Sequence, residues 1–565
     1  MIVPMKHLDL VCLASCREGT LRRLRELGVV HLDLASSSGD AVVNAKAKIS
    51  DAEKAVRIIR KARAGEMCDV RARSVEEVLA IDADRETLKT ERDRLEREIK
   101  RYEPFGDFDP VLAQELLSKV KGLTDVVALP EKLPSMRLSR LREKYDRVVN
   151  RINIDTAKLA ICDDMAILSS FPALAESMAF EQAKELLQDH GAICVISGWI
   201  PVSKLPALMG EVRNAKADLF ERANSLGWGV LVRDPAEGET PPTLIDPPRL
   251  FRPVKALFEG LGIAPGYTEA DVSVPFMCYF ALFFAMLVGD GAYGAIFLAA
   301  TLWGWKKYRA QKGNALMKAW LVMLTVFSSA TVLWGLLSNT WFGAQIPYFN
   351  SWPTVKWLAD PSYNNMMLLC FTIGVSHLML ARIWNGICKI NDTSAIAEFG
   401  WAGILLFMYF VTNSIVGIFS SIPQVMFYVF GFSLIAVFAF TVKPSELKSR
   451  GAELGMLPLN IMSALGDIIS YVRLFAVGLA SVKVAENFNS MAIGLYSGAD
   501  EWWLKAIFAL LMALILVLGH ALNLAMAGLS ILVHAVRLNT LEFSNHKGIS
   551  WAGYAFKPFR KIKEK

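Results

Sequence analysis

Two arginines lie inside long apolar stretches in the last fifth of this 565-residue chain. Arg473 is near the middle of the apolar window 456–485, and Arg537 is near the end of the window 503–543. A cation at the centre of a membrane-spanning helix costs about 2.5–3.5 kcal/mol on insertion scales, so an arginine at such a depth is a functional hypothesis by default. These two residues are therefore the first candidates for chemistry.

Each arginine belongs to a stripe of small and polar residues with helical spacing. Steps of three and four residues around Arg473 reach Ser463, Gly466, Ser470, Val477, Ala480, Val484 and Asn487; those around Arg537 reach His520, Asn523, Ala527, Ser530, His534, Leu541 and Ser544. Residues at this spacing share one face of an α-helix. Such a face suits the wall of an ion-conducting half-channel. The alternative is polar contact between helices of one bundle, with Arg537 reaching toward the membrane surface.

Three carboxylates, Asp290, Asp467 and Glu542, also lie in the apolar windows, and we assign them structural or other intramembrane roles. Asp467 is six residues before Arg473, so we expect it to pair with another helix or to lie near a helix end. The Gly-x-Gly-x-x-Gly pattern at 289–294 follows no strand and is a false dinucleotide fingerprint. The chain also has no GxxxxGK[ST] motif, so if it serves an ATP-driven machine we expect another chain to hydrolyse the ATP. We expect no catalytic residue, cofactor or metal site in this chain.

The elements that position these residues are apolar windows near 273–305, 317–338, 363–385, 398–420, 423–442, 456–485 and 503–543. Each is long enough to span the hydrocarbon layer. The first is interrupted at 289–294, so it can form two spans or a re-entrant pair. Basic clusters at 306–318, 443–450 and 557–565 are expected to be cytoplasmic. We predict about eight helices in a membrane domain over 273–545, with a basic cytoplasmic tail over 546–565.

Residues 1–250 are charge-rich and contain no membrane-length apolar run, and 251–272 are expected to be a linker. Two small α/β lobes are predicted from a strand at 8–12, a helix at 20–27 ended by Gly28, a strand at 29–34, a helix at 181–188 and a strand at 192–197. Between them, segments 75–101 and 136–170 are predicted to form an antiparallel coiled coil, or else ordinary long surface helices. The fold class is thus an α+β domain followed by an all-α membrane domain.

Composition excludes several classes. The chain is 53% hydrophobic and 21% charged with a net charge of +6, which fits neither a disordered protein nor a nucleic-acid-binding one. Its eight cysteines show no CxxC spacing, so we expect reduced thiols rather than disulfides or a zinc site. Residues 1–10 lack the apolar core of a secretory signal, and the N-terminal domain is expected to be cytoplasmic.

Segment 465–480, LGDIISYVRLFAVGLA, resembles the arginine-bearing helix of subunit a of V-type ATPases, called subunit I in bacterial and archaeal V/A-type enzymes. Further similar segments follow the family's order: GWIP at 198–201, FFAMLVGDGAYG at 283–294 and VHAVRLNTLEF at 533–543. The two family arginines correspond to Arg473 and Arg537, and His534 is also retained. Two positions depart from eukaryotic members, with Ser481 in place of a histidine and Ala527 in place of a glutamate.

The resemblance implies a non-catalytic stator in the lipid bilayer, beside a rotating ring of proteolipid (c/K) subunits. Its other implied partners are peripheral stalk subunits of the E/G type and a central-stalk or ring-cap subunit. A ring carboxylate would release H+ or Na+ beside an arginine, which stays charged at physiological pH. A secondary active transporter with a cytoplasmic regulatory domain is the main alternative; it would carry substrate-binding residues near the bilayer midplane. A purely structural membrane anchor is a further one.

Overall fold

The structure, a computed structural model, describes residues 2–32, 40–63, 73–119, 133–210, 228–236, 238–311, 315–358, 363–442, 452, 454–497 and 501–561. It has two compact units, each considered separately below. The helical unit contains Met1–Pro4 and Glu237–Phe556, and the sheet unit contains Met5–Ala236 and Lys557–Lys565. Residues 1–4 therefore belong to the helical unit although the sheet unit follows them in sequence, and residues 557–565 belong to the sheet unit although they follow the helical unit.

The sheet unit is built on one four-stranded antiparallel sheet. Its strands are β1 (Met5–Leu13), β2 (Gln188–His190), β3 (Ile193–Pro201) and β4 (Gly229–Arg233), in the order β2-β3-β1-β4. The prediction of two separate lobes is wrong, because β1 pairs directly with β3 and the two strand-containing segments complete one sheet. Such a pairing between distant segments leaves no signal in local periodicity.

Helix α1 (Arg17–Leu27) covers this sheet next to η1 (Ala14–Cys16), and η5 (Val202–Lys204) follows β3. Helix α1 ends at Gly28, which has φ of 58° in the left-handed conformation expected of a glycine C-cap. The strand predicted at 29–34 does not form over its described residues; only His31 makes an isolated bridge, to Trp199. Asp33 and Leu34 lie outside the described residues.

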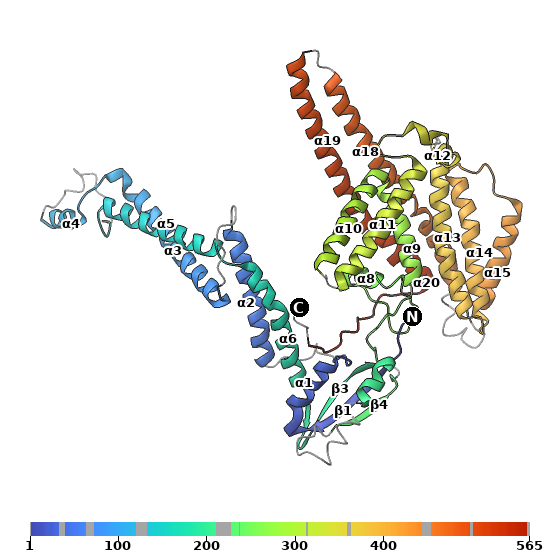
Figure 1. Cartoon of the computed structure of the whole chain (residues 1–565), viewed down its shortest axis with the longest axis horizontal. Helices are drawn as coiled ribbons and strands as arrows, with labels where there is room; N and C mark the ends of the chain where they lie inside the picture. Colours follow the sequence, from blue (N-terminus) through green and yellow to red (C-terminus); the bar gives the residue numbers. More distant parts are fainter. Residues whose placement is uncertain are drawn as a thin grey trace. The chain divides into compact units, whose positions relative to one another are not determined.

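Long helices extend from the sheet as two successive pairs (Figure 1). The first pair is α2 (Asp40–Ala62) with α6 (Asp164–Glu185), and the second is α3 (Val75–Tyr102) with α5 (Leu138–Ala160). η3 (Glu103–Phe105) and α4 (Pro110–Lys119) follow α3. The α3–α5 pair is antiparallel and buries Leu95 and Tyr102 of α3 against Leu141 and Val148 of α5. These are the segments for which the sequence predicted a coiled coil.

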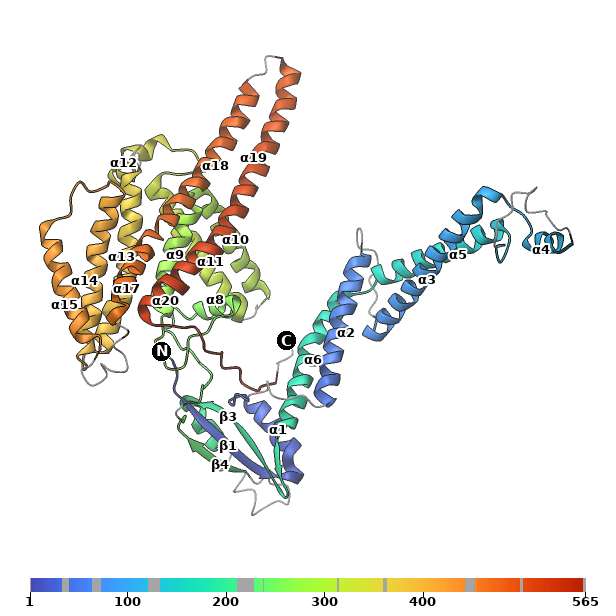
Figure 2. The same cartoon turned by 180° about the vertical axis from the view of Figure 1, so that it is seen from behind.

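The helical unit is built of helices around a large apolar core, with a second, small apolar cluster. Its elements are α8 (Val254–Leu261), α9 (Ser273–Val288), α10 (Gly291–Gln311), α11 (Ala315–Ser338), η6 (Pro347–Ser351), α12 (Pro353–Leu358), α13 (Asn364–Cys388), α14 (Ser394–Ile415), α15 (Gln424–Phe440), α17 (Leu457–Ile469), α18 (Val472–Ser497), α19 (Trp502–Ser530), the π-helical segments η8 (Ile531–Ala535) and η9 (Leu538–Phe543), and α20 (Ser544–Lys547). Helices α18 and α19 run side by side as a long hairpin (Figures 1 and 2).

Five helical segments of the described chain are long and apolar enough to cross a membrane: Leu316–Ser338, Asn364–Cys388, Ser394–Ile415, Leu457–Ser497 and Trp503–Lys547. Two shorter apolar helices, α9 and α15, accompany them. The window 273–305 is divided at Gly289, whose φ of 69° ends α9. The total of eight spans stays a prediction, and the basic clusters that oriented it lie partly or wholly outside the described residues.

The expected linker at 251–272 contains α8, and its Val254 and Phe258 are buried in the core of the helical unit. The last residues of the chain contribute to both units. Ala552 and Ala555 bridge to residues of the helical unit. Beyond them, the Phe559 amide donates to the Val30 carbonyl of the sheet unit at 2.8 Å.

Candidate functional site

A break between α17 and α18 positions Arg473. Tyr471 fills this break and is fully buried, and its hydroxyl is 2.9 Å from Nδ1 of His377 on α13. On the facing helix, a Cβ at Gly374 would lie 2.5 Å from the tyrosine ring. Only glycine at position 374 therefore leaves room for this ring, which lies at the helix break two residues before the arginine.

One buried carboxylate lies between the two arginines. Oε1 of Glu542 is 3.6 Å from Nη1 of Arg473 and 3.4 Å from Nε of Arg537, and only 4% of its side chain is exposed. Nη2 of Arg473 also donates to Oγ of Ser470 at 3.0 Å. We call Ser470, Arg473, Arg537 and Glu542 the arginine cluster. Within it, a single negative charge holds two guanidinium groups near one another.

The π-helical segment η9 brings Glu542 to this place. Arg537 and Glu542 are five residues apart, which in an α-helix separates two side chains by about 140° around the axis. A π-helix bonds residues five apart, so the same two side chains are only about 50° apart. Strict α-helical spacing had placed Leu541 on the arginine face instead; in the structure Leu541 is 50% exposed and Glu542 is buried.

A second polar group joins α10, α18 and α19. The Asn523 amide donates to the Tyr293 hydroxyl at 3.2 Å and to the Ser481 carbonyl at 2.9 Å. The Tyr293 hydroxyl is 2.7 Å from Nδ1 of His520, and Nε2 of His520 is 3.2 Å from Oδ1 of Asn489. His520 and Asn523 of the predicted stripe thus lie together, in contact with residues that sequence reasoning missed.

In the described part of the chain, the remaining predicted residues make no contact with one another that links them into a further group. His534 is on η8 near the arginine cluster, where the charges of Arg473 and Arg537 act on it, and its buried Nδ1 has no hydrogen-bond partner among the described residues. Ser530 is half-buried in the last turn of α19, whereas Asn487 is exposed on α18. Asp290 caps the start of α10: its two oxygens accept from the amides of Ala292 and Gly343, both at 2.8 Å.

Asp467 lies near the end of α17 and pairs with another helix, as expected, and it belongs to a third polar group whose other members the sequence did not predict. Its Oδ2 is 3.0 Å from Nε2 of His546 on α20. On the other side of that imidazole, Nε of Arg382 donates to Nδ1 at 3.2 Å, and Nη1 of Arg382 donates to Glu398 at 3.2 Å. Arg382 and Glu398 lie inside predicted apolar windows, so the energetic cost that singled out Arg473 could have found them as well.

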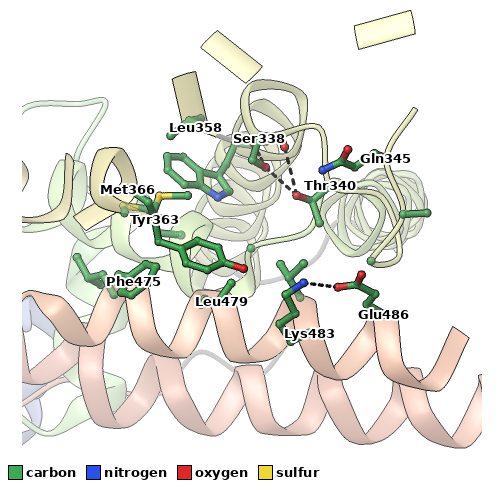
Figure 3. Close-up of a pocket in the computed structure, with 18 residues that line it drawn as sticks. Ser338, Thr340, Gln345, Leu358, Tyr363, Met366, Phe475, Leu479, Lys483 and Glu486 are labelled. Carbon is green, nitrogen blue, oxygen red and sulfur yellow. Dashed lines mark hydrogen bonds and ion pairs between the residues drawn. The ribbon is translucent and has the colours of Figure 1, made fainter. Parts of the chain in front are cut away.

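Two cavities flank the segment that carries Arg473. One, of about 590 Å³, is lined by Asn460, Ser463 and Asp467 of α17 and by Arg382 and His546. The other, of about 570 Å³, is lined by the following α18 residues and the loop after α11. Figure 3 shows Lys483 and Glu486 on the α18 side of this second cavity and Ser338, Thr340 and Gln345 on its opposite side. Among the described residues, no group of three or more His, Cys, Asp or Glu side chains could hold a metal ion.

Comparison with known proteins identifies the family to which this chain belongs. No protein-family profile matches the chain. V-type ATP synthase subunit I of Borreliella burgdorferi is 31% identical over 447 residues, which cover 76% of this chain and 69% of that protein. This chain belongs to the V/A-type ATP synthase subunit I family. V-type ATP synthase subunit I 1 of Treponema pallidum is 28% identical over 99% of this chain and 100% of its own length.

An archaeal relative agrees with this assignment. A-type ATP synthase subunit I of Methanocaldococcus jannaschii is 24% identical over 85% of this chain and 69% of its own length. The resemblance inferred from the sequence is therefore confirmed. Together with the five apolar helices, family membership makes this chain a membrane subunit of that class of complex.

Proposed function

We propose that this chain is the membrane stator of a rotary V/A-type ATP synthase, with the arginine cluster facing a ring of proteolipid subunits. The observation that carries the proposal is the pairing of two arginines with one buried carboxylate beside a little-covered helix, since Arg537 and Glu542 directly follow α19 in the chain. Only 11% of the most apolar window of Trp503–Lys547 is buried, against 61% for Ser394–Ile415. A helix so little covered has most of its surface free for lipid or for another chain of the complex.

Part of each arginine side chain is exposed and can contact a neighbouring chain. The side chain of Arg537 is 51% exposed. The side chain of Arg473 is 25% exposed; its Nη1 is buried, makes no hydrogen bond to any described residue and lies 3.6 Å from the carboxylate of Glu542. A ring carboxylate arriving here would meet two permanent cations that share one carboxylate. That environment favours its ionised form, so it would release the ion it carries.

The two cavities support two half-channels. The 590 Å³ cavity borders α17, which precedes Arg473, and the 570 Å³ cavity borders α18, which follows it. The arginine therefore lies between them along the chain. An ion would enter through one cavity, travel on the rotating ring and leave through the other, while the fixed positive charge of Arg473 opposes direct passage.

The two long helix pairs of the sheet unit fit an arm that anchors peripheral stalks. Exposed ion pairs cover their surfaces, such as Lys100 with Glu96 and Lys144 with Glu91, and such a surface is suited to water and to polar partners. We place this arm and both termini in the cytoplasm, with a central-stalk or ring-cap subunit as a further partner. The chain itself performs no covalent chemistry in this proposal.

The test is ATP-driven ion uptake into vesicles that contain the assembled complex. Arg473→Ala is expected to abolish uptake while the complex still assembles, because the charge at the transfer point is gone. Lys505→Ala, which removes an exposed cation from the first turn of α19, is the matched control and should transport normally. Undiminished uptake by Arg473→Ala would refute the stator assignment, and uptake by the isolated chain would favour a secondary transporter.

A further inference from the structure

The group of Asp467, His546 and Arg382 lines the 590 Å³ cavity and lies close to the arginine cluster. We propose that Asp467 and His546 form a proton relay between this cavity and the arginine cluster, so that the ion moved is H+. The inference rests on the stator function proposed above. It adds the identity of the ion and of two residues that carry it.

The two hydrogen bonds of the His546 ring determine which of its nitrogens carries a proton. An arginine can only donate, so Nδ1 of His546 must accept the bond from Nε of Arg382. The imidazole proton is then on Nε2, which donates to Oδ2 of Asp467 at 3.0 Å. His546 is therefore neutral here, is 5% exposed, and has one nitrogen ready to accept a proton and the other ready to donate one.

The two residues lie one helical turn from the arginine cluster along both chain segments. Asp467 is three residues before Ser470, and His546 is four residues after Glu542. One turn of helix corresponds to about 5.4 Å. Asn460 and Ser463 continue the polar face of α17 from Asp467 along the cavity. The cavity volume of about 590 Å³ is large enough for a chain of water molecules.

The charges around His546 disfavour a metal cation. They come from every element packed around it: Arg382 of α13, Lys389 directly after α13, Glu398 of α14, Asp467 of α17, Glu542 of η9 and Lys547 of α20. Glu398 is already paired with Arg382 at 3.2 Å and with Lys389 at 2.7 Å, and Glu542 with the two cluster arginines. Asp467 would be the ligand left for Na+, but it is bonded to His546 and lies close to the Arg382 cation. A proton, in contrast, binds covalently to the imidazole.

The transfer is a balanced proton exchange. A hydronium ion in the cavity gives its proton to Nδ1 of His546 as Arg382 releases that nitrogen and keeps its bond to Glu398. One O–H bond breaks and one N–H bond forms. The imidazolium then passes its Nε2 proton to the carboxylate of Asp467, which becomes neutral and can transfer the proton onward to a ring carboxylate. His546 is left with its proton on Nδ1, and a flip of the imidazole ring turns that nitrogen toward Asp467 and restores the starting arrangement. The reverse sequence delivers a proton to the cavity.

The experiment measures ATP-driven acidification in vesicles that contain the assembled complex, in buffers free of Na+. His546→Gln is the central variant because its amide can donate to Asp467 and its carbonyl can accept from Arg382, but it cannot relay a proton. We expect the uptake rate to fall by about 100-fold, the scale of a lost acid–base group. The rate of this variant should also lose the part of its pH dependence that protonation of His546 gives the wild type. Asp467→Asn is the second variant, and Ser376→Ala, on the same helix as Arg382, is the control.

Three results would overturn parts of the inference separately. Wild-type rate and pH profile in both His546→Gln and Asp467→Asn, with Arg473→Ala inactive, would eliminate the relay and leave the stator function intact. Uptake of radioactive Na+ by the wild type without acidification would eliminate both the proton assignment and the relay, and leave the stator function intact. Normal transport by Arg473→Ala would remove the stator function and the relay with it. If His546→Gln does not assemble, Asp467→Asn decides the question.

Discussion

Replacing Glu542 with glutamine removes the charge that holds the two arginines, and we expect it to destabilise the helical unit. The carboxylate oxygen lies 3.4 Å and 3.6 Å from the two guanidiniums. At an effective dielectric constant of about 20, each attraction is roughly 5 kcal/mol before desolvation costs are subtracted. Removing one partner of a buried ion pair costs about 3–5 kcal/mol. Because the Arg537 side chain is half exposed, we expect about 3 kcal/mol, at the lower end of that range.

The assay is the apparent melting temperature of the detergent-purified chain, followed with a thiol-reactive dye that reports exposure of buried cysteines such as Cys370. A loss of about 3 kcal/mol should lower this temperature by about 6 °C in a unit of this size. Glu486→Gln is the matched control. It breaks an ion pair with Lys483 of which both side chains are about half exposed, so its effect should be under about 1 kcal/mol. Equal melting temperatures for the two variants would refute the role of Glu542 as shared counter-ion.

Two further predictions concern other parts of the chain. Gly478→Ala should destabilise the helical unit by about 1–3 kcal/mol, because its Cβ would lie 2.6 Å from the Met286 carbonyl oxygen; Gly466→Ala, with nothing within 4 Å, should melt no lower than wild type. In the sheet unit, burial of Asp164 opposes ionisation, but hydrogen bonds from Arg60 and Arg63 outweigh it and lower its pKa. The stabilisation is therefore present at pH 7 and lost as the pH falls below about 4. Asp164→Asn should accelerate hydrogen exchange in α2 and α6 at pH 7, and an equal acceleration at pH 3 would contradict this.

Local features of the sequence were sufficient for much of the architecture. The apolar windows, the interruption at 289–294 and the C-cap at Gly28 all depend on residues near one another in the chain. The helix predicted at 75–101 forms at Val75–Tyr102. Arg473 and Arg537 could be singled out because the cost of a charge in an apolar helix depends on composition alone.

Contacts between distant segments were decided only by the tertiary structure. The pairing of β1 with β3 joins residues nearly 190 positions apart, and Asp467 meets a histidine 79 positions away. Neither pairing has a periodic signal in the sequence. The position of Glu542 depends on a π-helical register, and a prediction that assumes 3.6 residues per turn places its neighbour Leu541 there instead. The sequence by itself determined which residues are costly to bury, and the folded chain determined which of them share a counter-ion, because that requires packing between segments that local spacing does not describe.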